Sequence, residues 1–353
     1  MFSCCRSSEP GMPRMVRATT NPYGPGHGWV KLRFGLPGMR SVVRKGLVDP
    51  EGIPEPTRLV IHSSIYENKI LLDQDPDYIN RLAASARNRA EKRAWLEGAW
   101  DIVAGGMFDD AWDERYNVVK PFPIPPNWRI QRSFDWGSSK PFSVGWWAQS
   151  NGEDIILPGE DGGVRSTVRG DIYRIREWYG WTGKPNEGLR MLATDIAQGI
   201  VERELRWGFR REKNNWCRVK GGVADAQIFS AENGNCIATD MKVRTRLDDG
   251  YNYPGIGWDP SDKRAGSRVT GWEQMRTMLR NAHPPKYGVR EHPGMFIWDN
   301  CDQFQRCVPV LPRDEKDPDD VNTEAEDHNA DETRYYVRSL GIITVSGTTS
   351  GMH

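Results

Sequence analysis

Apolar and polar residues alternate with two different periods in the second half of the chain. Strand-like segments lie at 128–135, 142–149, 171–181, 218–227 and 294–300. Helical spacing of apolar residues predicts helices over 186–205, 267–282 and 325–340. Three antiparallel strands followed by alternating helices and strands are typical of an α/β fold, a mixed sheet with helices on both faces.

The first part of the chain predicts a smaller α/β segment. "RMVRATTN" (14–21) reads as a buried strand, 58–64 as a second strand, and 75–98 as a helix that Asp75 caps and Gly98 ends. The proline-rich "PFPIPP" (121–126) predicts a stiff linker. The predicted organisation is a first domain, a linker, a second domain and a tail, over 1–117, 118–127, 128–342 and 343–353.

Composition excludes several classes of protein. The 353 residues suffice for two domains, and equal numbers of basic and acidic residues, 48 each, argue against a globally basic nucleic-acid coat. No apolar run is long enough to span a membrane, and Met1–Pro10 lacks the apolar core of a secretory signal. Six cysteines without a CxxC pair indicate neither a zinc ribbon nor a redox motif and predict reduced thiols in a cytosolic protein.

Carboxylates stand at the predicted ends of three elements. Asp135 ends the first strand of the second domain and Asp225 ends a later strand, while Asp331 shares a helix face with His328 and Asp327. The first strand and the strand after the helical crossover are typically neighbours, so Asp135 and Asp225 can meet, and a helix across the strand ends can add Asp331. Clustered carboxylates repel unless cations neutralise them, and such oxygen ligands suit Mg²⁺ or Mn²⁺. Two such ions about 4 Å apart are a known device for phosphodiester cleavage. Taken singly, each aspartate is more typical of a surface turn or a solvated helix face than of a metal site.

A basic run follows the helix over 186–205. Between 203 and 220, seven Lys or Arg stand against two Glu and are interleaved with tryptophan and phenylalanine. Such a run predicts either a DNA-binding patch that tracks phosphates or the end of a surface helix. Its cationic residues are Arg203, Arg206, Arg210, Arg211, Lys213, Arg218 and Lys220. By contrast, 314–332 carries ten acidic residues and one Lys, which predicts a solvated loop feeding an acidic helix.

At four motifs the second domain resembles the C-terminal nuclease domain of a bacteriophage terminase large subunit. The motifs are "RSFDWGSSKPFSVGWW", "REWYGW" with "NEGLRM", "GGVADAQIF" and "AEDHNADETRYY". The resemblance implies a ribonuclease H-like fold with Asp135, Asp225 and Asp331 as catalytic ligands of two divalent metal ions. His328 matches a histidine near the metals in some members, and Asp327 is an alternative ligand to Asp331.

The first domain resembles the end of the family's packaging ATPase domain. "ATTNP" looks like its coupling segment, with Thr19, Thr20 and Asn21, and "WLEGAWDIVAGGMF" looks like the exit from that domain. No GxxxxGK[ST] phosphate loop occurs, so ATP is not expected to bind, and the chain looks like a terminase that begins partway through its ATPase, by truncation, gene splitting or design. The predicted fold before the linker is therefore a partial P-loop-type α/β segment.

The resemblance implies a metal-dependent endonuclease that cuts concatemeric double-stranded viral DNA during packaging, in the host cytoplasm and transiently docked on the procapsid. The implied partners are the terminase small subunit, the portal protein and further copies in a ring. Another ribonuclease H-like nuclease, of resolvase or transposase type, and a non-catalytic DNA- or portal-binding remnant are the alternatives.

Overall fold

The computed structural model describes residues 15–22, 27–36, 41–46, 54–86, 89–100, 106–157, 163–231, 235–285, 287–314 and 316–341. The chain divides into two compact units, Met1–Ala104 and Gly105–His353. The predicted border at 118–127 is wrong, because β3 (Val118–Val119) joins the sheet of the second unit and Phe122 is buried in its core. The proline-rich segment is therefore part of the second unit and not a linker.

The described residues of the first unit form short helices and a two-stranded sheet. In chain order its elements are α1 (His27–Phe34), β1 (Val42–Arg44), β2 (Arg58–Val60), η2 (Ile65–Glu67), α2 (Lys69–Gln74), α3 (Tyr78–Ser85) and α4 (Arg89–Glu97). β1 and β2 pair antiparallel, and several large apolar side chains on this unit are exposed, among them Leu59, Ile61 and Ile70. The predicted helix over 75–98 is two helices, since Ala86 leaves α3 with an extended backbone.

The predicted strand over 14–21 is wrong within the described residues. Residues 15–21 form no strand and are exposed, including Thr19, Thr20 and Asn21. Three apolar positions among polar ones suffice to predict a strand, but among the described residues no strand pairs with this segment. The predicted ATPase-type fold of the first unit stays a prediction.

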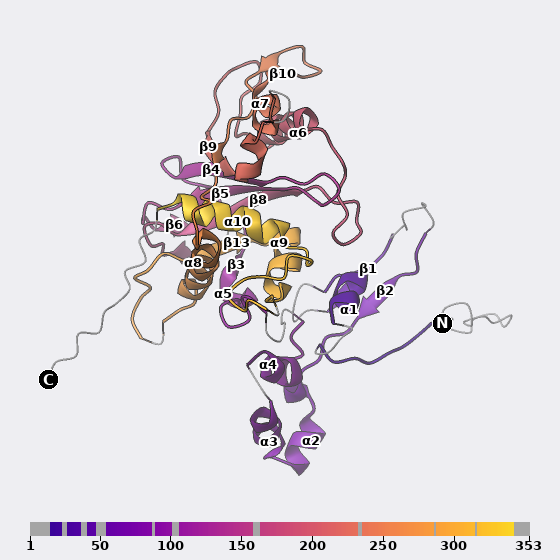
Figure 1. Ribbon diagram of the computed structural model, residues 1–353. Helices are drawn as coiled ribbons and strands as arrows, with labels where there is room; N and C mark the ends of the chain where they lie inside the picture. The colour runs from indigo at the N-terminus through magenta and orange to yellow at the C-terminus, as the bar shows by residue number, and fades with distance from the viewer. Residues whose placement is uncertain are drawn as a thin grey trace. The chain divides into compact units, whose positions relative to one another are not determined.

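A seven-stranded mixed sheet forms the centre of the second unit (Figure 1). Its order is β12-β9-β4-β5-β8-β13-β3. Its members besides β3 are β4 (Arg129–Asp135), β5 (Ser143–Gln149), β8 (Ile172–Tyr179), β9 (Val219–Ala224), β12 (Asp259–Pro260) and β13 (Met295–Trp298). β4, β5 and β8 form an antiparallel meander, and β9 and β12 add in parallel beside β4. Within it, β8-β5-β4-β9-β12 follow the strand order of a ribonuclease H-like fold, and the predicted mixed sheet flanked by helices is confirmed.

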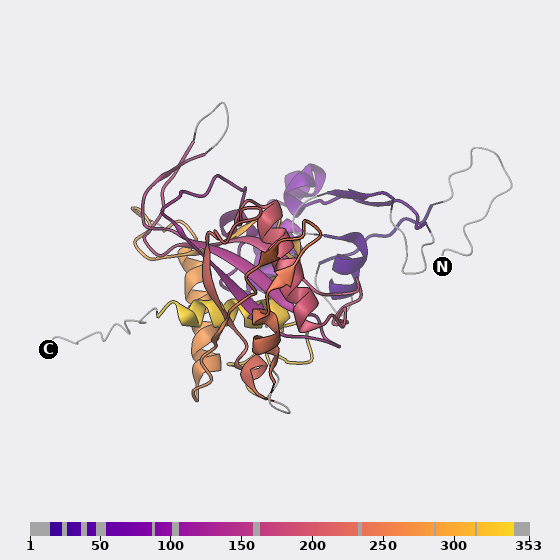
Figure 2. The same cartoon turned by 90° about the horizontal axis from the view of Figure 1, so that it is seen from above.

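Helices cover both faces of this sheet (Figure 1). α6 (Ala193–Arg206) and α7 (Ile237–Lys242) lie on one face, and α8 (Ser267–Asn281), α9 (Asp302–Cys307) and α10 (His328–Ser339) lie on the other. The remaining short elements are α5 (Glu114–Asn117), β6 (Ile155–Ile156), β7 (Val164–Arg165), η3 (Ala226–Phe229), β10 (Thr245–Arg246), β11 (Asn252–Tyr253) and η4 (Val308–Val310). β6 and β7 belong to an arm that extends away from the sheet (Figure 2).

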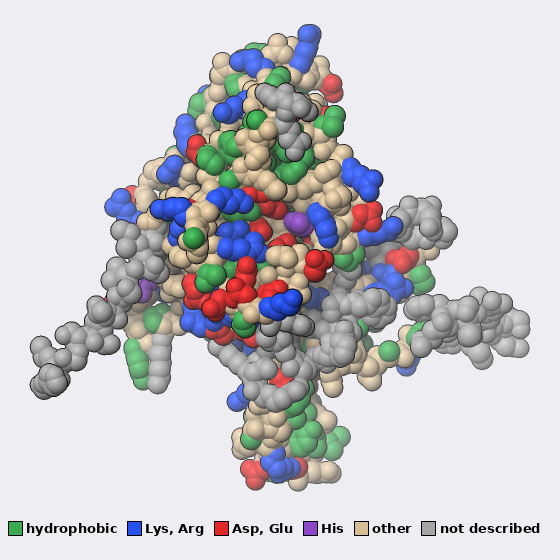
Figure 3. All heavy atoms as spheres, in the orientation of Figure 1, with side chains coloured by type: hydrophobic (Ala, Val, Ile, Leu, Met, Phe, Trp, Pro, Cys, Tyr) green, Lys and Arg blue, Asp and Glu red, His purple; other side chains and the backbone are tan. Residues whose placement is uncertain are grey.

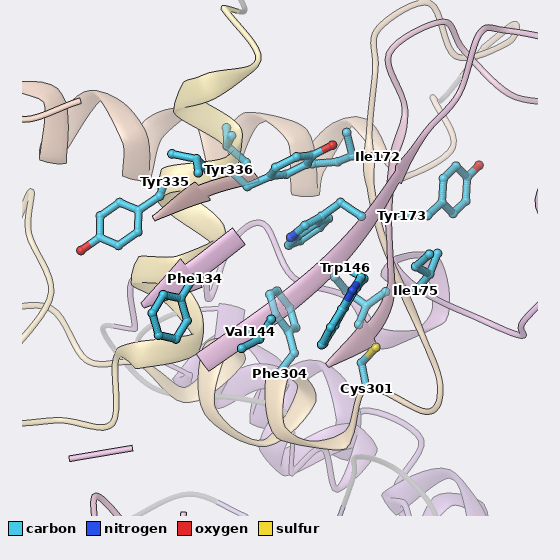
Figure 4. Close-up of a cluster of buried hydrophobic side chains, with 14 of the residues drawn as sticks. Phe134, Val144, Trp146, Ile172, Tyr173, Ile175, Cys301, Phe304, Tyr335 and Tyr336 are labelled. Atoms are coloured by element: carbon cyan, nitrogen blue, oxygen red, sulfur yellow. The ribbon is translucent and has the colours of Figure 1, made fainter. Parts of the chain in front are cut away.

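The core between the sheet and α10 is aromatic. Trp147 stacks on Tyr336 with ring centroids 4.9 Å apart, and Trp146 on the other face of β5 meets Trp207 edge-on at 4.9 Å. Tyr335 and Tyr336 leave α10 on opposite sides, and both are buried (Figure 4). Burial of such rings contributes about 1.5–3 kcal/mol each, which fixes α10 against the sheet.

Cys217, Cys236, Cys301 and Cys307 are free thiols, as predicted for these four. In the part of the chain that the structure describes, no helix is both long and apolar enough to cross a membrane.

Candidate active site

The ends of β4 and β9 lie side by side and place two of the predicted carboxylates together. Phe134 pairs with Ala224 in the parallel ladder, and Asp225 N donates to Phe134 O at 3.0 Å. The next residue along each chain segment is an aspartate: Asp135 is the last residue of β4, and Asp225 directly follows β9. Both are nearly inaccessible, at 6% and 7% exposure. The register of the β4–β9 ladder thus places Asp135 and Asp225 side by side, as predicted.

α10 crosses the same strand ends and brings the other predicted residues. It contacts β4, β5 and β9, and its first turn carries Asp327, His328 and Asp331. His328 Nδ1 lies 3.2 Å from Asp135 Oδ2 and 4.0 Å from Asp327 Oδ1. Residues far apart in the sequence thus meet at one edge of the sheet, where acidic side chains gather with basic ones beside them (Figure 3).

A buried polar network holds α10 in this position. Glu332, fully buried, accepts from Arg174 Nη1 of β8 at 2.5 Å, from Trp147 Nε1 of β5 at 3.2 Å and from the Ser133 hydroxyl of β4. A side chain at Gly145 would collide with the Glu332 carboxylate and come within 2.7 Å of Arg174 Nη1. Gly145 is thus required for the helix to sit this close to the sheet.

Cationic side chains neutralise the acidic cluster. Lys263 Nζ lies 2.8 Å from Asp225 Oδ1. Arg268, at the start of α8, places Nη1 3.3 Å from Asp331 and Nη2 3.7 Å from Asp327, while Arg334 donates to Asp331 at 2.9 Å. These ion pairs lower the repulsion that a cluster of buried carboxylates otherwise carries.

Burial and mutual repulsion shift the proton equilibria of the site. Burial raises the pKa of Asp135 to about 7; the hydrogen bond with His328 opposes the shift, and the charges of Asp331 and Asp225 add to it. Burial, with Asp331, raises the pKa of Asp327 to about 6. Burial lowers the pKa of His328, but the hydrogen bond to Asp135 and the surrounding carboxylates outweigh burial and raise it. The Asp135–His328 pair therefore retains a proton near neutral pH.

The donor set has the chemistry that a hard divalent cation takes, since it consists of carboxylate oxygens forced together in a nearly dry site. Across the described ranges, however, no three His, Cys, Asp or Glu side chains are arranged to hold a metal ion. The physical reason is visible in the contacts: Asp135 faces His328, Asp225 faces Lys263, and Asp331 faces two arginines. The predicted metal ligands are thus assembled but turned toward internal cations.

The predicted DNA-binding run divides into internal and exposed residues. Arg210 is buried and donates to Glu204 at 2.5 Å, Arg203 lies 3.6 Å over the Trp178 ring, and Arg218 donates to the carbonyls of Ile124 and Pro125. Arg210 is thus part of the fold, while Arg203 and Arg218 are half-buried and held against the protein by these contacts. The exposed members are Arg206, Arg211, Lys213 and Lys220. Lys220 stands at the start of β9, roughly 15 Å along the strand from Asp225, so a role of these four in DNA binding stays a prediction.

Sequence reasoning missed Lys263 and Arg268, because isolated cations on a loop and at a helix start carry no distinctive spacing. The predicted helix over 186–205 also began too early. α6 begins at Ala193 after Leu192, whereas Asn186 has a left-handed backbone, φ 60°, and its side chain reaches His328. The sequence offers one indication of this role for Asn186: asparagine tolerates the left-handed conformation better than most residues.

No protein-family model matches the chain, and no curated protein matches it either. Among solved structures the chain is similar to the P22 large terminase nuclease domain, at 14% identity and TM-score 0.42, over 67% of this chain and 93% of that one. It is also similar to the large terminase of a thermophilic bacteriophage in complex with ADP, at 17% identity and TM-score 0.42, over 79% of this chain and 55% of that one. A third is the large terminase nuclease of thermophilic phage G20c with bound cobalt, at 8% identity and TM-score 0.35, over 67% and 97%.

The resemblance to phage large terminases predicted from the motifs thus recurs among solved structures. The chain spans about half the length of the ADP-bound terminase that it matches.

Proposed function

We propose that this protein is a metal-dependent endonuclease of the phage terminase type, which cuts double-stranded viral DNA during packaging. The observation that carries the proposal is the convergence of Asp135, Asp225 and the first turn of α10 at one edge of a ribonuclease H-like sheet, with His328 against Asp135. A structural role alone does not call for such a cluster, since taking several carboxylates and their cations out of water costs free energy that apolar side chains would not.

Asp135, Asp225 and Asp331 would hold two divalent ions, Mg²⁺ or Mn²⁺, with Asp327 adjoining. Bound there, such ions supply an activated water and stabilise the oxygen that leaves phosphorus. Asp135 occupies the centre of the set, because Asp225 adjoins it on the sheet and His328 adjoins it on α10. His328, with Nδ1 directed at Asp135, is placed to hold or pass the proton that phosphodiester hydrolysis moves between water and the leaving oxygen.

Exposed cations flank this edge of the sheet and offer a path for the DNA backbone. Lys140 lies on the turn after Asp135, and Lys184 and Arg190 lie on the loop that follows β8. These two loops are hydrogen-bonded to each other through Gly188 N and Ser139 O at 2.8 Å. We propose that they approach the phosphates next to the cut, and that the exposed residues of 206–220 contact DNA further along.

The test is cleavage of supercoiled plasmid by the purified chain in Mg²⁺, in Mn²⁺ and in EDTA. We expect nicking and linearisation in either metal and none in EDTA. Asp135→Asn and Asp225→Asn abolish cutting, while Asp154→Asn, an exposed aspartate on the loop after β5, retains it. Near wild-type cutting by Asp135→Asn contradicts the site assignment.

The same assay separates the alternatives. Strong preference for a four-way junction over linear duplex favours a resolvase-type nuclease. DNA binding without any metal-dependent cutting favours a non-catalytic remnant that binds DNA or the portal. The terminase proposal further expects association with the small subunit and the portal protein, and a ring of copies in the motor, which co-purification from infected cells measures.

A further inference from the structure

The loop between β8 and α6 is held against the turn that follows Asp135. Besides the bond from Gly188 N to Ser139 O, Arg190 N donates to Ser138 O at 3.2 Å. Within the loop itself, Leu189 N donates to Gly180 O at 3.0 Å. A Cβ at Gly188 would collide with the carbonyls of Ser138 and Lys140, so only glycine permits the approach. The loop is therefore built to sit at the edge of the candidate site.

Asn186, at the bend of this loop, is the residue that reaches into the site. Its Oδ1 lies 3.0 Å from His328 Nε2, and its Nδ2 donates to Glu324 O at 3.2 Å. The second bond sets the orientation of the amide, so that the oxygen and not the nitrogen faces the imidazole. The backbone of Asn186 is left-handed, φ 60°. Strained backbone of this kind in a non-glycine residue is concentrated at functional sites.

These contacts clamp His328 from both sides. Nδ1 faces Asp135 Oδ2 at 3.2 Å and Nε2 faces Asn186 Oδ1 at 3.0 Å, which fixes the rotation of the ring about both side-chain torsions. Without Asn186, only one hydrogen bond orients the ring, on the first residue of a helix, where backbone packing is weakest. A misplacement of a reacting group by about 1 Å can lower a rate by about 10²-fold.

We propose that Asn186 is a positioning residue of the nuclease: it holds His328 so that Nδ1 faces Asp135. The proposal rests on the proposed nuclease function for its kinetic consequence, but the orientation of the ring is a property of the protein alone. Asn186 itself is not required to touch the DNA or a metal ion.

The experiment compares Asn186→Gly, Asn186→Asp and His328→Ala in the full chain, with the double variant Asn186→Gly/His328→Ala. Glycine keeps the left-handed backbone without strain and removes only the side chain, whereas aspartate keeps an oxygen toward the imidazole. Asn127→Ala is the matched control, since this exposed asparagine precedes β4 at the end opposite Asp135. The rate and the DNA concentration at half-maximal rate are measured on plasmid in Mn²⁺.

Asn186→Gly should lower the maximal rate about tenfold with an unchanged half-saturating DNA concentration, and Asn186→Asp should recover most of the loss. In the His328→Ala background, Asn186→Gly should have no further effect. An equal loss in both backgrounds, or a change only in the half-saturating concentration, overturns the proposal, because Asn186 then acts through the loop or through DNA binding.

A second measurement does not depend on cutting. The ring ¹⁵N and ¹H signals of His328, identified by their loss in His328→Ala, should change in Asn186→Gly and stay in place in Asn127→Ala. Unchanged ring signals overturn the positioning role even where the chain is a nuclease. Changed ring signals in a chain that cuts no DNA retain the contact and reject the nuclease function.

Discussion

Replacing Glu332 by glutamine tests whether the buried network, and not helix propensity, holds α10 across the strand ends. Glu332 and Arg174 are both fully buried, and their contact of 2.5 Å is the centre of the network. Removing one charge of a buried pair costs about 3–5 kcal/mol, because the partner is left uncompensated. Arg174 keeps a second carboxylate, Glu177, at 3.4 Å, which places the expected loss near the lower end, about 3 kcal/mol.

Thermal unfolding followed by near-ultraviolet circular dichroism measures this loss, since Trp147 lies within the network. For a unit of this size, about 3 kcal/mol corresponds to a fall of roughly 6–12 °C in the midpoint. The matched control is Glu273→Gln on α8, whose side chain is 61% exposed and lies 3.5 Å from Arg276. A surface pair of this kind contributes at most about 1 kcal/mol. A Glu332→Gln midpoint within the range of the control would refute the reasoning, and α10 would then be held by its apolar contacts alone.

Three further predictions concern pH, salt and ATP. The pKa of Asp135 is about 7 in the folded protein and 3.8 in the free group. Between these pH values the folded metal-free protein therefore binds more protons than the unfolded chain. The raised pKa of His328 acts in the same direction. The melting temperature in EDTA should therefore fall from pH 6 to pH 8, and Asp135→Asn should flatten the fall; a rise with pH contradicts the assignment. The double variant Arg206→Ala/Arg211→Ala should reduce the salt dependence of DNA binding. Arg210→Ala should chiefly destabilise the fold, because Arg210 pairs with the buried Glu204. Equal salt slopes for the wild type and the double variant would place the DNA elsewhere. Finally, phosphate release with and without DNA should show no ATP hydrolysis by this chain, and robust hydrolysis by pure protein contradicts the interpretation of its first part.

The second unit was largely predictable because its signals are local and repeated. The alternation of apolar and polar residues located β4, β5 and β8. Because the first strand and the strand after the helical crossover usually pair in such a sheet, the sequence also predicted that Asp135 lies next to Asp225. β12 was missed, because a strand of two residues carries no alternation. The border between units was misplaced because a proline-rich stretch predicts stiffness but not where it packs, and Phe122 packs into the second unit.

The failures at the charged residues have a different cause. A sequence displays the charges of 203–220 but not their directions, and a single buried glutamate, Glu204, recruits Arg132 at 3.0 Å and Arg210 at 2.5 Å into the fold. Similarly, Lys263 and Arg268 come to the acidic cluster only because the segment before α8 follows β12 back to the strand ends. Cationic residues that the tertiary structure places beside a site show no characteristic spacing in the sequence.

Stability and site geometry are linked through a single turn of α10. His328 and Asp331 point to the strand ends, and Glu332, the next residue, points into the sheet toward Ser133, two residues before Asp135 on β4. A shift of β4 by one residue would exchange its two faces and remove Asp135 from the site together with the partner of Glu332. The contact that fixes the helix therefore also fixes the distance from His328 to Asp135. Gly145 and Glu332 lie outside the candidate site, yet a change at either should alter the rate of DNA cutting in proportion to the displacement of α10. An intact carboxylate at Asp135 is therefore not sufficient for activity.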